Sequence, residues 1–426
     1  MERVTSFVAS TFSGPPPRGL PQLPAVAKLS PRVVRVLGQN PSAFTLQGTN
    51  TYLVGTGKRR WLVDTGEGRA QYPPLLVRAM EEEGVEELAG VLLTHWHNDH
   101  VGGLLGVRRA LAAQHARRSD DDRRRLDDDG TRTRVGGSPG VLCAHKRVRR
   151  GQGERAVVAV TGADAACSGP TSAGGAAAAD TTNDPAAHRA YVDIADGEVF
   201  ECEGATLRAL FTPGHAEDHM CFVLEEEGAL FAGDCVLNGN TATFEDLGQY
   251  SASLERMQST LAAAVEAART REGERETKKG DDDDGGGRDD RTALGRLYPS
   301  HGDVVEDGAK KLREYCKHRT WRESIFMDVL RREWRERPSR GGVTSWELCS
   351  AVYARQVSYL VLATACANIT TQHLRKLVDE GRVRREVRRG WFGLWREARY
   401  YPEAAEMEAG VRSRKKNTIE EDAAIA

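Results

Sequence analysis

Short apolar runs that end at polar or turn residues dominate the chain up to about residue 301. Such runs are typical of strands buried in a sheet. Stretches with apolar positions three or four residues apart separate some of them and predict helices at 73–83, 102–113 and 253–268. Mixed strands and helices in this order predict stacked sheets flanked by helices. The expected strands are 51–54, 60–63, 90–93, 205–211, 220–224, 229–232 and 294–298.

Beyond residue 301 the apolar spacing becomes helical and stays so from 308 to 335, where Pro338 and two glycines interrupt it. The chain then continues with three shorter helical stretches and a basic ribbon at 345–353, 359–367, 370–380 and 381–401. The change in pattern predicts a separate C-terminal domain.

Two segments combine dense charge with Gly, Ala, Ser and Thr, near 112–190 and 270–291. They offer little apolar area to offset the entropy lost on ordering. We therefore expect disordered inserts at both places, with a strand at 140–144 as the exception.

The overall composition narrows the class of protein. The chain has 426 residues, a hydrophobic fraction of 39% with 44 further Gly, and a net charge of −2, so a folded core is expected and no global field favours nucleic acid or an anionic membrane. Eight scattered cysteines without a CxxC pair fit a reducing compartment. The most apolar stretch, 357–367, is too short to cross a bilayer.

These features and a weak transit-peptide pattern in residues 1–14 predict a protein of the mitochondrial matrix or cytoplasm, neither secreted nor membrane-bound.

The strongest chemical signal is the run Thr94-His95-Trp96-His97-Asn98-Asp99-His100, which directly follows an expected strand. Three imidazoles and one carboxylate in six residues are hard to explain by packing, because neutral histidines need hydrogen-bond partners and charged ones repel one another. Metal ligation resolves both problems, and zinc takes these ligands. The alternative is a polar loop with chance histidines.

Further ligand-type residues follow three other expected strands, namely His215, Asp234 and His301. Each alone is more readily structural. Side chains at the ends of several strands can nevertheless converge on one sheet edge. Together with the histidine run they predict one metal centre.

The order of these residues resembles the metallo-β-lactamase superfamily, with its His-x-His-x-Asp-His motif and later His, Asp and His ligands. Within it the chain is most similar to the β-lactamase-like protein 2 group of zinc-dependent endoribonucleases, through NPSAFTLQGTNTYLVGTG at 40–57 and through 94–97, 212–220 and 244–247. The resemblance covers most of 29–322 outside the inserts. It implies an α/β fold, an αββα sandwich followed by a C-terminal winged-helix domain.

The resemblance also implies a domain division and a ligand set. The divisions are a flexible segment 1–28, a metallo-β-lactamase domain 29–307 that contains both inserts, a linking helix 308–339, a winged-helix domain 340–404 and a charged tail 405–426. Two zinc ions per chain are implied. One is held by His95, His97 and His215, the other by Asp99, His100 and His301, and Asp234 bridges them.

Four positions around this ligand set leave alternatives open. Asp64 matches a superfamily position that braces the metal loop, although a plain turn-forming Asp is equally plausible. His219 is either a support for the ligands or a satisfied surface histidine. Ser300 replaces a glycine of the family pattern and would be strained if that position needs positive φ. Residues 238–241 replace a segment richer in Gly, so the pocket wall near Asp234 is expected to differ.

Two zinc ions that share a water would supply hydroxide at neutral pH without a side-chain nucleophile. That chemistry suits an ester, thioester, lactam or phosphodiester alike. The family suggests that Asp99, besides ligating metal, is catalytic and orients or deprotonates the water. The predicted centre thus indicates the reaction class and leaves the substrate open.

The C-terminal ribbon bears on the substrate. Residues 382–399 contain seven Arg against two Glu, a local net charge of +5, with three aromatic residues interleaved after a possible recognition helix at 370–377. This composition suits phosphate contacts and base stacking. The alternatives are a solvated wing with core aromatics or a partner-binding module. The candidate RNA contacts are Lys376, Arg382, Arg384, Arg385, Arg388 and Arg389.

We therefore expect a dizinc endoribonuclease that cleaves single-stranded RNA. The alternative is a thioesterase, because fungal acyl-carrier-protein thioesterases resemble the same catalytic domain and glyoxalase-II-like enzymes use the same site. An adaptor on an inactive hydrolase fold is a third reading, which seven intact ligands disfavour. Assembly into a homo-oligomer stays open.

Overall fold

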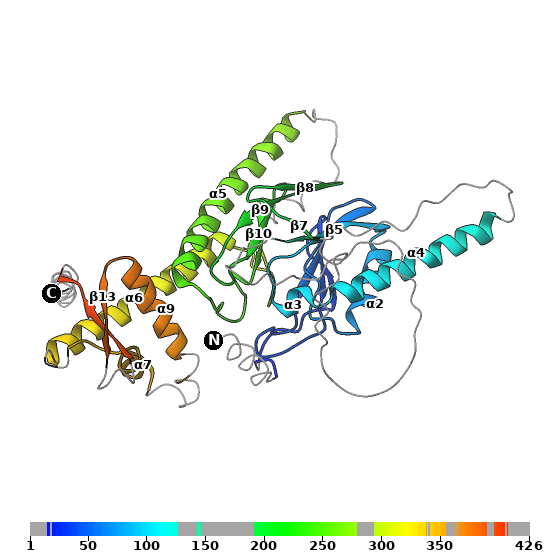
Figure 1. Ribbon diagram of the computed structural model, residues 1–426. Coiled ribbons are helices and arrows are strands. Elements are labelled where there is room, and N and C mark those ends of the chain that lie inside the picture. The colour runs from blue at the N-terminus through cyan, green and yellow to red at the C-terminus, as the bar shows by residue number, and fades with distance from the viewer. Residues whose placement is uncertain are drawn as a thin grey trace, which may run out of the picture. The chain divides into compact units, whose positions relative to one another are not determined.

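The computed structural model describes residues 15–17, 19–126, 143–145, 191–278, 294–337, 339, 341–354, 363, 366–389, 396–404 and 407 (Figure 1). The chain divides into two compact units. The sandwich unit comprises 1–244 and 253–312, and the C-terminal unit comprises 245–252 and 313–426.

The first sheet of the sandwich unit places its strands in the order in which they occur along the chain. The first four pair in antiparallel fashion and the remainder in parallel. Its strands are β1 (Val26–Lys28), β2 (Val33–Leu37), β3 (Asn50–Val54), β4 (Arg59–Val63), β5 (Glu87–Leu92), β6 (Cys143–His145) and β7 (Tyr191–Asp193).

The second sheet has the order β12-β11-β10-β9-β8. Only its β11–β12 pair is parallel. Its strands are β8 (Val199–Cys202), β9 (Ala205–Phe211), β10 (Met220–Leu224), β11 (Ala229–Gly233) and β12 (Leu297–Pro299).

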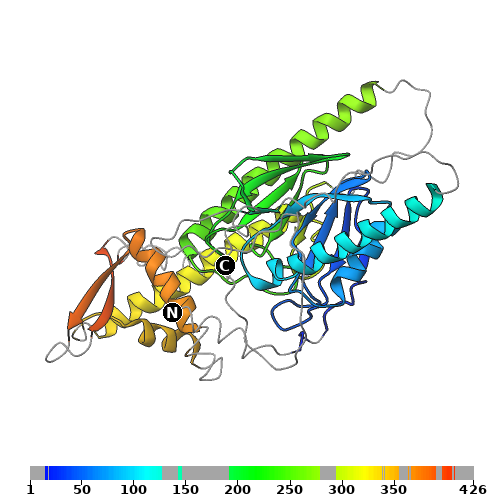
Figure 2. The same cartoon turned by 45° about the vertical axis from the view of Figure 1, so that its right-hand side comes forward.

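Helices cover the outer faces of both sheets (Figures 1 and 2). Helices α2 (Tyr72–Glu82) and α4 (Leu104–Leu126) pack on the first sheet through a buried apolar cluster. On the second sheet, Arg256 of α5 (Leu247–Lys278) donates to the Phe211 carbonyl over 2.9 Å. This is the αββα sandwich that the sequence predicts.

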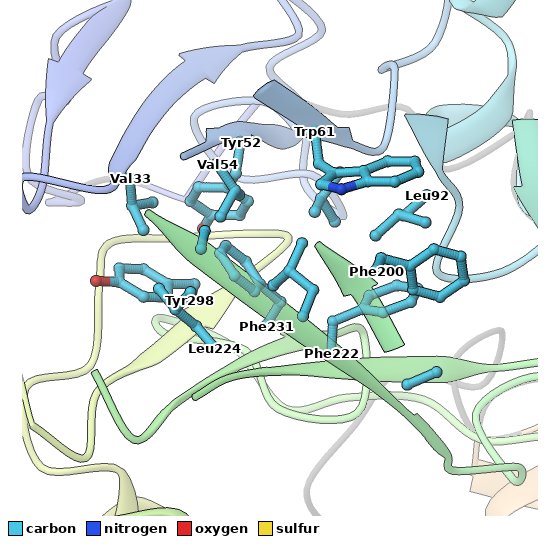
Figure 3. Packing of buried hydrophobic residues seen from close by; sticks show 14 of the residues in the cluster. Val33, Tyr52, Val54, Trp61, Leu92, Phe200, Phe222, Leu224, Phe231 and Tyr298 are labelled. Atoms are coloured by element: carbon cyan, nitrogen blue, oxygen red, sulfur yellow. The ribbon is translucent and has the colours of Figure 1, made fainter. Parts of the chain in front are cut away.

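The space between the two sheets is filled by aromatic and branched side chains (Figure 3). The Tyr52 ring meets that of Phe231 edge-on at 5.2 Å, and Phe231 stacks on Tyr298 at 5.0 Å. Trp61 and Phe200 form a second edge-on pair at 5.3 Å. Such pairs contribute about 0.5–1.5 kcal/mol beyond the area they bury, so this layer fixes the two sheets face to face.

The C-terminal unit has the helix order and β-ribbon of a winged helix, as predicted. Thr344 and Glu347 cap its helix α7 reciprocally, each side chain bonding the other residue's backbone N–H. The apolar sides of the helices and Val383 of the ribbon form one buried cluster. The elements are α6 (Gly308–Glu336), α7 (Ser345–Tyr353), α9 (Ala367–Asp379), and the antiparallel pair β13 (Val383–Arg389) and β14 (Arg396–Pro402).

Several boundary predictions need correction. Residues 112–126 continue α4 and residues 270–278 continue α5, so these parts of the expected inserts are helical. Both stretches contain many strong helix formers, such as Ala, Arg and Glu, and this outweighed their charge. Residues 26–28 of the expected flexible segment form β1.

Other expectations fall partly or wholly outside the described residues. These are the rest of both inserts, most of the expected helix 359–367, residues 1–14 and most of the charged tail. Within the described residues, no helix is long and apolar enough to cross a membrane.

Candidate metal centre

The topology brings the ligand-type residues to one edge of the sandwich. Asp64 follows β4, and the run from Thr94 follows β5, which is parallel to β4, so both lie at the carboxyl ends of neighbouring strands. Asp234 and His301 follow the parallel pair β11 and β12 in the same way. Carboxyl ends of strands are where open α/β sheets hold their ligands.

Three imidazoles converge at the first subsite. The Nε2 atom of His95 lies 2.8 Å from Nδ1 of His97, and Nε2 of His215 lies 3.2 and 3.1 Å from these two atoms. His215 Nδ1 donates to the Thr243 carbonyl over 2.9 Å, so its Nε2 presents a lone pair to the other two rings. Nitrogens bound tetrahedrally to one zinc at about 2.0 Å stand about 3.3 Å apart, close to the observed spacing.

The second subsite contains Asp99, His100 and His301. Asp99 Oδ2 lies 3.2 Å from His100 Nε2 and 3.1 Å from His301 Nε2. Asp234 faces both subsites, because its Oδ1 lies 3.3 Å from His301 Nε2 while its Oδ2 lies 3.6 Å from His215 Nε2. The structure therefore brings all seven predicted ligands together and places Asp234 between the two groups.

Two buried atoms test whether metal ions fit this arrangement. His100 Nε2 and Asp234 Oδ1 are buried and have no hydrogen-bond partner among the residues that the structure describes. Such atoms are costly when left unpaired. Three imidazole nitrogens around a carboxylate in one group, and two imidazoles with a carboxylate in the other, are a suitable donor set for two divalent cations such as zinc.

The protonation states of the histidines differ between the two groups. Burial lowers the pKa of His97 to about 3 and that of His95 well below its usual value. Burial opposes ionisation of Asp99 and Asp234, yet the His100 and His301 imidazoles hold the pKa of both carboxyls well below its usual range. The same carboxylates raise the pKa of His301 to about 9 and that of His100 well above its usual value. Metal binds neutral imidazoles and ionised carboxylates, so an ion in the second group would displace the protons of these two rings.

Asp64 braces the histidine loop. Its side chain accepts the backbone N–H of Thr94 over 2.9 Å, the Thr94 hydroxyl over 2.9 Å and the His100 Nδ1 proton over 2.8 Å. Its φ of 57° is unusual for a residue other than glycine, and these bonds hold it there. Of the two alternatives, the structure supports the brace. Because Nδ1 of His100 faces Asp64, Nε2 is the nitrogen of that ring that faces the candidate metal position.

His219 is buried and supports the backbone of the central carboxylate. Its Nε2 accepts the Asp234 N–H over 3.1 Å, so its Nδ1 retains the proton and points to Thr212 Oγ1 at 2.9 Å. With Cys221 and Cys235 it forms a second group of ligand-type side chains. Both nitrogens of His219 are occupied by hydrogen bonds, so this group supports the centre and is no metal site itself. Sequence analysis missed both cysteines, because Cys221 lies within the apolar strand β10 and Cys235 stands before the apolar residues Val236 and Leu237.

The structure accommodates both departures from the family pattern, Ser300 and residues 238–241. Ser300 does not have a positive φ, so the expected strain is absent. Its N–H donates to the Gly233 carbonyl over 3.1 Å, and its carbonyl accepts from the Asn50 N–H over 2.7 Å. The Asn238 amide donates to the Asp303 carbonyl over 3.1 Å and thereby ties the 238–241 wall to the loop after His301.

The candidate RNA contacts lie in different surroundings. Lys376 and Arg382 both form ion pairs with Glu323 of α6. Arg384 lies over the Tyr401 ring at 5.0 Å, and Arg388 donates to the Tyr401 hydroxyl over 3.0 Å. Arg385 is exposed, and the side chain of Arg389 lies outside the described part of the chain.

Comparison with known proteins identifies the family. Residues 44–274 match the metallo-beta-lactamase superfamily, and residues 344–391 match the beta-lactamase associated winged helix domain. The chain belongs to the metallo-beta-lactamase superfamily of hydrolases.

Individual relatives have names that are more specific than that of the family. The chain is 32% identical over 381 residues to the atrochrysone carboxyl ACP thioesterase of Passalora fulva, covering 88% of this chain and 84% of the relative. It is 33% identical over 378 residues to atrochrysone carboxyl ACP thioesterase AgnL7 of Paecilomyces divaricatus, with coverages of 88% and 90%. It is also 33% identical to lactamase-like protein nscB of Aspergillus fumigatus, with 88% of each chain covered.

These relatives correct the expected subgroup, because two are named thioesterases and none of the three is named an endoribonuclease. Among solved structures, a beta-lactamase domain protein from Burkholderia ambifaria has a TM-score of 0.53 at 16% identity and covers 90% of this chain and 96% of its own. That similarity supports the fold alone.

Proposed function

We propose that the protein is a zinc-dependent thioesterase that hydrolyses an acyl thioester attached to a carrier protein. The observation that supports it most directly is the convergence of seven ligand-type side chains into two adjoining groups that share Asp234. The names of the thioesterase relatives, which match over 88% of the chain, favour a thioester among the bonds such a centre can cleave.

Two bound zinc ions would supply hydroxide at neutral pH and withdraw electron density from the thioester carbonyl. His95, His97 and His215 would hold one ion, Asp99, His100 and His301 the other, and Asp234 both. Asp99 keeps a quarter of its side chain exposed, so one of its oxygens can orient the attacking water and accept its proton. Trp96, 36% exposed with its ring 4.6 Å from that of His97, offers an apolar surface for the acyl group.

The surroundings of the basic residues weigh against RNA as the substrate. Lys376 and Arg382 neutralise Glu323 inside the C-terminal unit instead of facing solvent as free cations. The exposed side chains of helix α9 sum to no net charge, since Arg375 is balanced by Asp379 and the other two are Asn368 and Thr371. A helix that reads nucleic acid needs an excess of positive charge.

The test compares two substrates on the same zinc-loaded protein. Release of free thiol from an acyl thioester and cleavage of end-labelled single-stranded RNA are followed side by side, with Asp99→Asn as the inactive control. We expect thiol release that Asp99→Asn abolishes, and two zinc ions per chain by elemental analysis. RNA cleavage that depends on Asp99, without thiol release, would overturn the proposal.

A further inference from the structure

The charge of the chain is divided unevenly. Residues 313–403, which make up most of the C-terminal unit, contain 19 basic and 11 acidic side chains, a net charge of +8. The whole chain has a net charge of −2, so the remaining residues sum to −10. A basic module on an otherwise acidic hydrolase is a feature that the chemistry at the metal centre does not require.

Part of this excess is displayed on strand β13. Residues i and i+2 of a strand face the same side. Val383, 2% exposed, packs in the core, whereas Val387 on the same side is 51% exposed and Arg385 between them is exposed as well. The core-facing side of the strand therefore continues past the core as a surface that is both apolar and basic.

The other side of β13 presents two arginines held by one aromatic ring. Arg384 lies 5.0 Å from the centre of the Tyr401 ring, and Arg388 bonds to its hydroxyl. Tyr401 is itself fixed, because its hydroxyl donates to the Gly341 carbonyl over 2.8 Å. Both arginines remain exposed, and the pair that Arg384 forms with Glu386 at 3.4 Å lies at the surface, where it is weak. Ordering long side chains before binding reduces the entropy lost on binding, so these cations suit recognition of a partner.

The exposed side of α9 argues that this partner is a protein. In a winged helix that binds nucleic acid, this helix would enter a groove lined by phosphates, and here its exposed side chains sum to zero charge. The surface on β13 combines exposed cations with an exposed valine, a mixture that fits an acidic protein surface with apolar residues among its carboxylates.

We propose that strand β13 of the C-terminal unit binds an acidic carrier protein that delivers the acyl group as a thioester. The contacts would be made by Arg384, Arg385, Val387 and Arg388. This inference rests on the proposed thioesterase function and adds the recognition surface for its macromolecular substrate. Charge complementarity identifies the partner, and it raises the rate of encounter more than it strengthens the final complex.

The test separates docking from chemistry. The substrates are an acyl thioester on an acyl carrier protein of net negative charge and the same acyl group on N-acetylcysteamine, a small uncharged thiol. The variants are Arg385→Glu, whose exposed side chain forms no hydrogen bond or ion pair with the described residues, and the triple variant R384Q/R385Q/R388Q. The matched control is K58Q/R59Q/R78Q in the sandwich unit, where the three cations are 76%, 62% and 62% exposed and each pairs with a glutamate, as Arg384 does.

We expect kcat/KM for the carrier substrate to fall by about tenfold or more in the β13 variants, through KM and with a weaker dependence on salt. Hydrolysis of the small thioester and the behaviour of the control should not change. If wild type and variants hydrolyse the carrier substrate equally, the docking proposal is wrong and the thioesterase proposal stands. If neither thioester is hydrolysed, the thioesterase proposal fails.

Binding of the unacylated carrier protein, measured by calorimetric titration, tests the surface without any turnover. Loss of binding in the triple variant but not in the control supports the proposal. Equal binding by wild type and triple variant overturns it. A single-stranded RNA whose gel shift at physiological salt depends on these three arginines, without carrier binding, would assign the surface to nucleic acid instead.

Discussion

Both units hold histidine side chains away from solvent, but the surroundings of these side chains differ. At the candidate metal centre His97 lies half-buried beside other imidazoles and two carboxylates, and its Nδ1 faces Nε2 of His95 at 2.8 Å and Nε2 of His215 at 3.1 Å. In the C-terminal unit His373, 1% exposed, packs against the Phe326 ring at 4.7 Å, and neither of its nitrogens has a hydrogen-bond partner in the described part of the chain.

Burial lowers the pKa of both histidines to about 3. The shared shift shows that a strongly perturbed pKa does not by itself indicate a functional site. What distinguishes the centre is convergence, since donors from four loops meet there and Asp64 fixes the orientation of His100. Among the described residues, burial against Phe326 and the nearby cations Arg319 and Arg322 account for the low pKa of His373, which therefore reflects a cost of packing.

Among the substitutions that test this comparison, we expect the largest effect at Asp234, which faces both groups of the centre. In Asp234→Asn one negative charge between the two metal positions is lost. We expect the zinc content to fall by at least one equivalent per chain and the rate of thiol release to fall more than about 100-fold. Mutating a residue that merely supports a metal ligand already lowers metal affinity or activity about 10–100-fold. Elemental analysis that finds the variant fully loaded would refute the bridging assignment.

The supporting residue Asp64 should have the next largest effect. Asp64→Asn removes the charged acceptor of the His100 Nδ1 proton, so we expect zinc affinity to fall about 10–100-fold in a titration against a chelator. Asp196→Asn, which breaks an exposed ion pair with Arg256 at 2.7 Å, is the matched control and should keep wild-type affinity. Equal affinities in all three proteins would mean that Asp64 only forms a turn.

His373 tests the other side of the comparison. As the pH falls through 6.5 the unfolded histidine takes up a proton, whereas the folded one does so only near pH 3, so stability is lost progressively between these values. Between pH 7 and pH 4.5 the wild type should lose roughly 2–3 kcal/mol more than His373→Leu does. Hydrogen exchange of the α9 amides in the full chain measures this difference. Identical pH dependence in both proteins would show that His373 is solvated when folded.

The smallest effect concerns Ser300, which replaces a family glycine beside His301. Its φ is not positive, so Ser300→Gly relieves no strain and should cost up to about 1 kcal/mol through added freedom of the unfolded chain. Thermal melting of the wild type and the variant, with the zinc content of each determined, measures this difference in stability. A variant that is clearly more stable than the wild type would reveal strain at this position after all.

Sequence reasoning predicted which side chains converge because the information for this is local. The run from His95 to His100 lies in one loop, and His215, Asp234 and His301 each follow an apolar strand. Sequence reasoning could not predict which groups fix the rings. The Thr243 carbonyl bonds His215 across 28 residues, and the Asp234 N–H bonds His219 across 15. These contacts depend on how strands register with one another, which no spacing along the chain records.

The fold was predicted at the level of layers and not of boundaries. Helix α4 continues to Leu126 because good helix formers persist where charge alone suggested a loop. The substrate was predicted least well, since the basic ribbon indicated cations without showing that Glu323 neutralises Lys376 and Arg382. Such pairing depends on tertiary contacts of α6 with α9 and β13.

The parallel strand pairs have a consequence for how such a chain can vary over evolution. The ligands follow the carboxyl ends of β4, β5, β11 and β12, whereas residues 127–142 and 279–293 lead into the amino ends of β6 and β12. Because these strands run parallel to their neighbours, the two ends lie at opposite edges of the sandwich. Lengthening a connection costs little free energy, so the chain can gain or lose residues where it enters β6 and β12 without displacing the ligands.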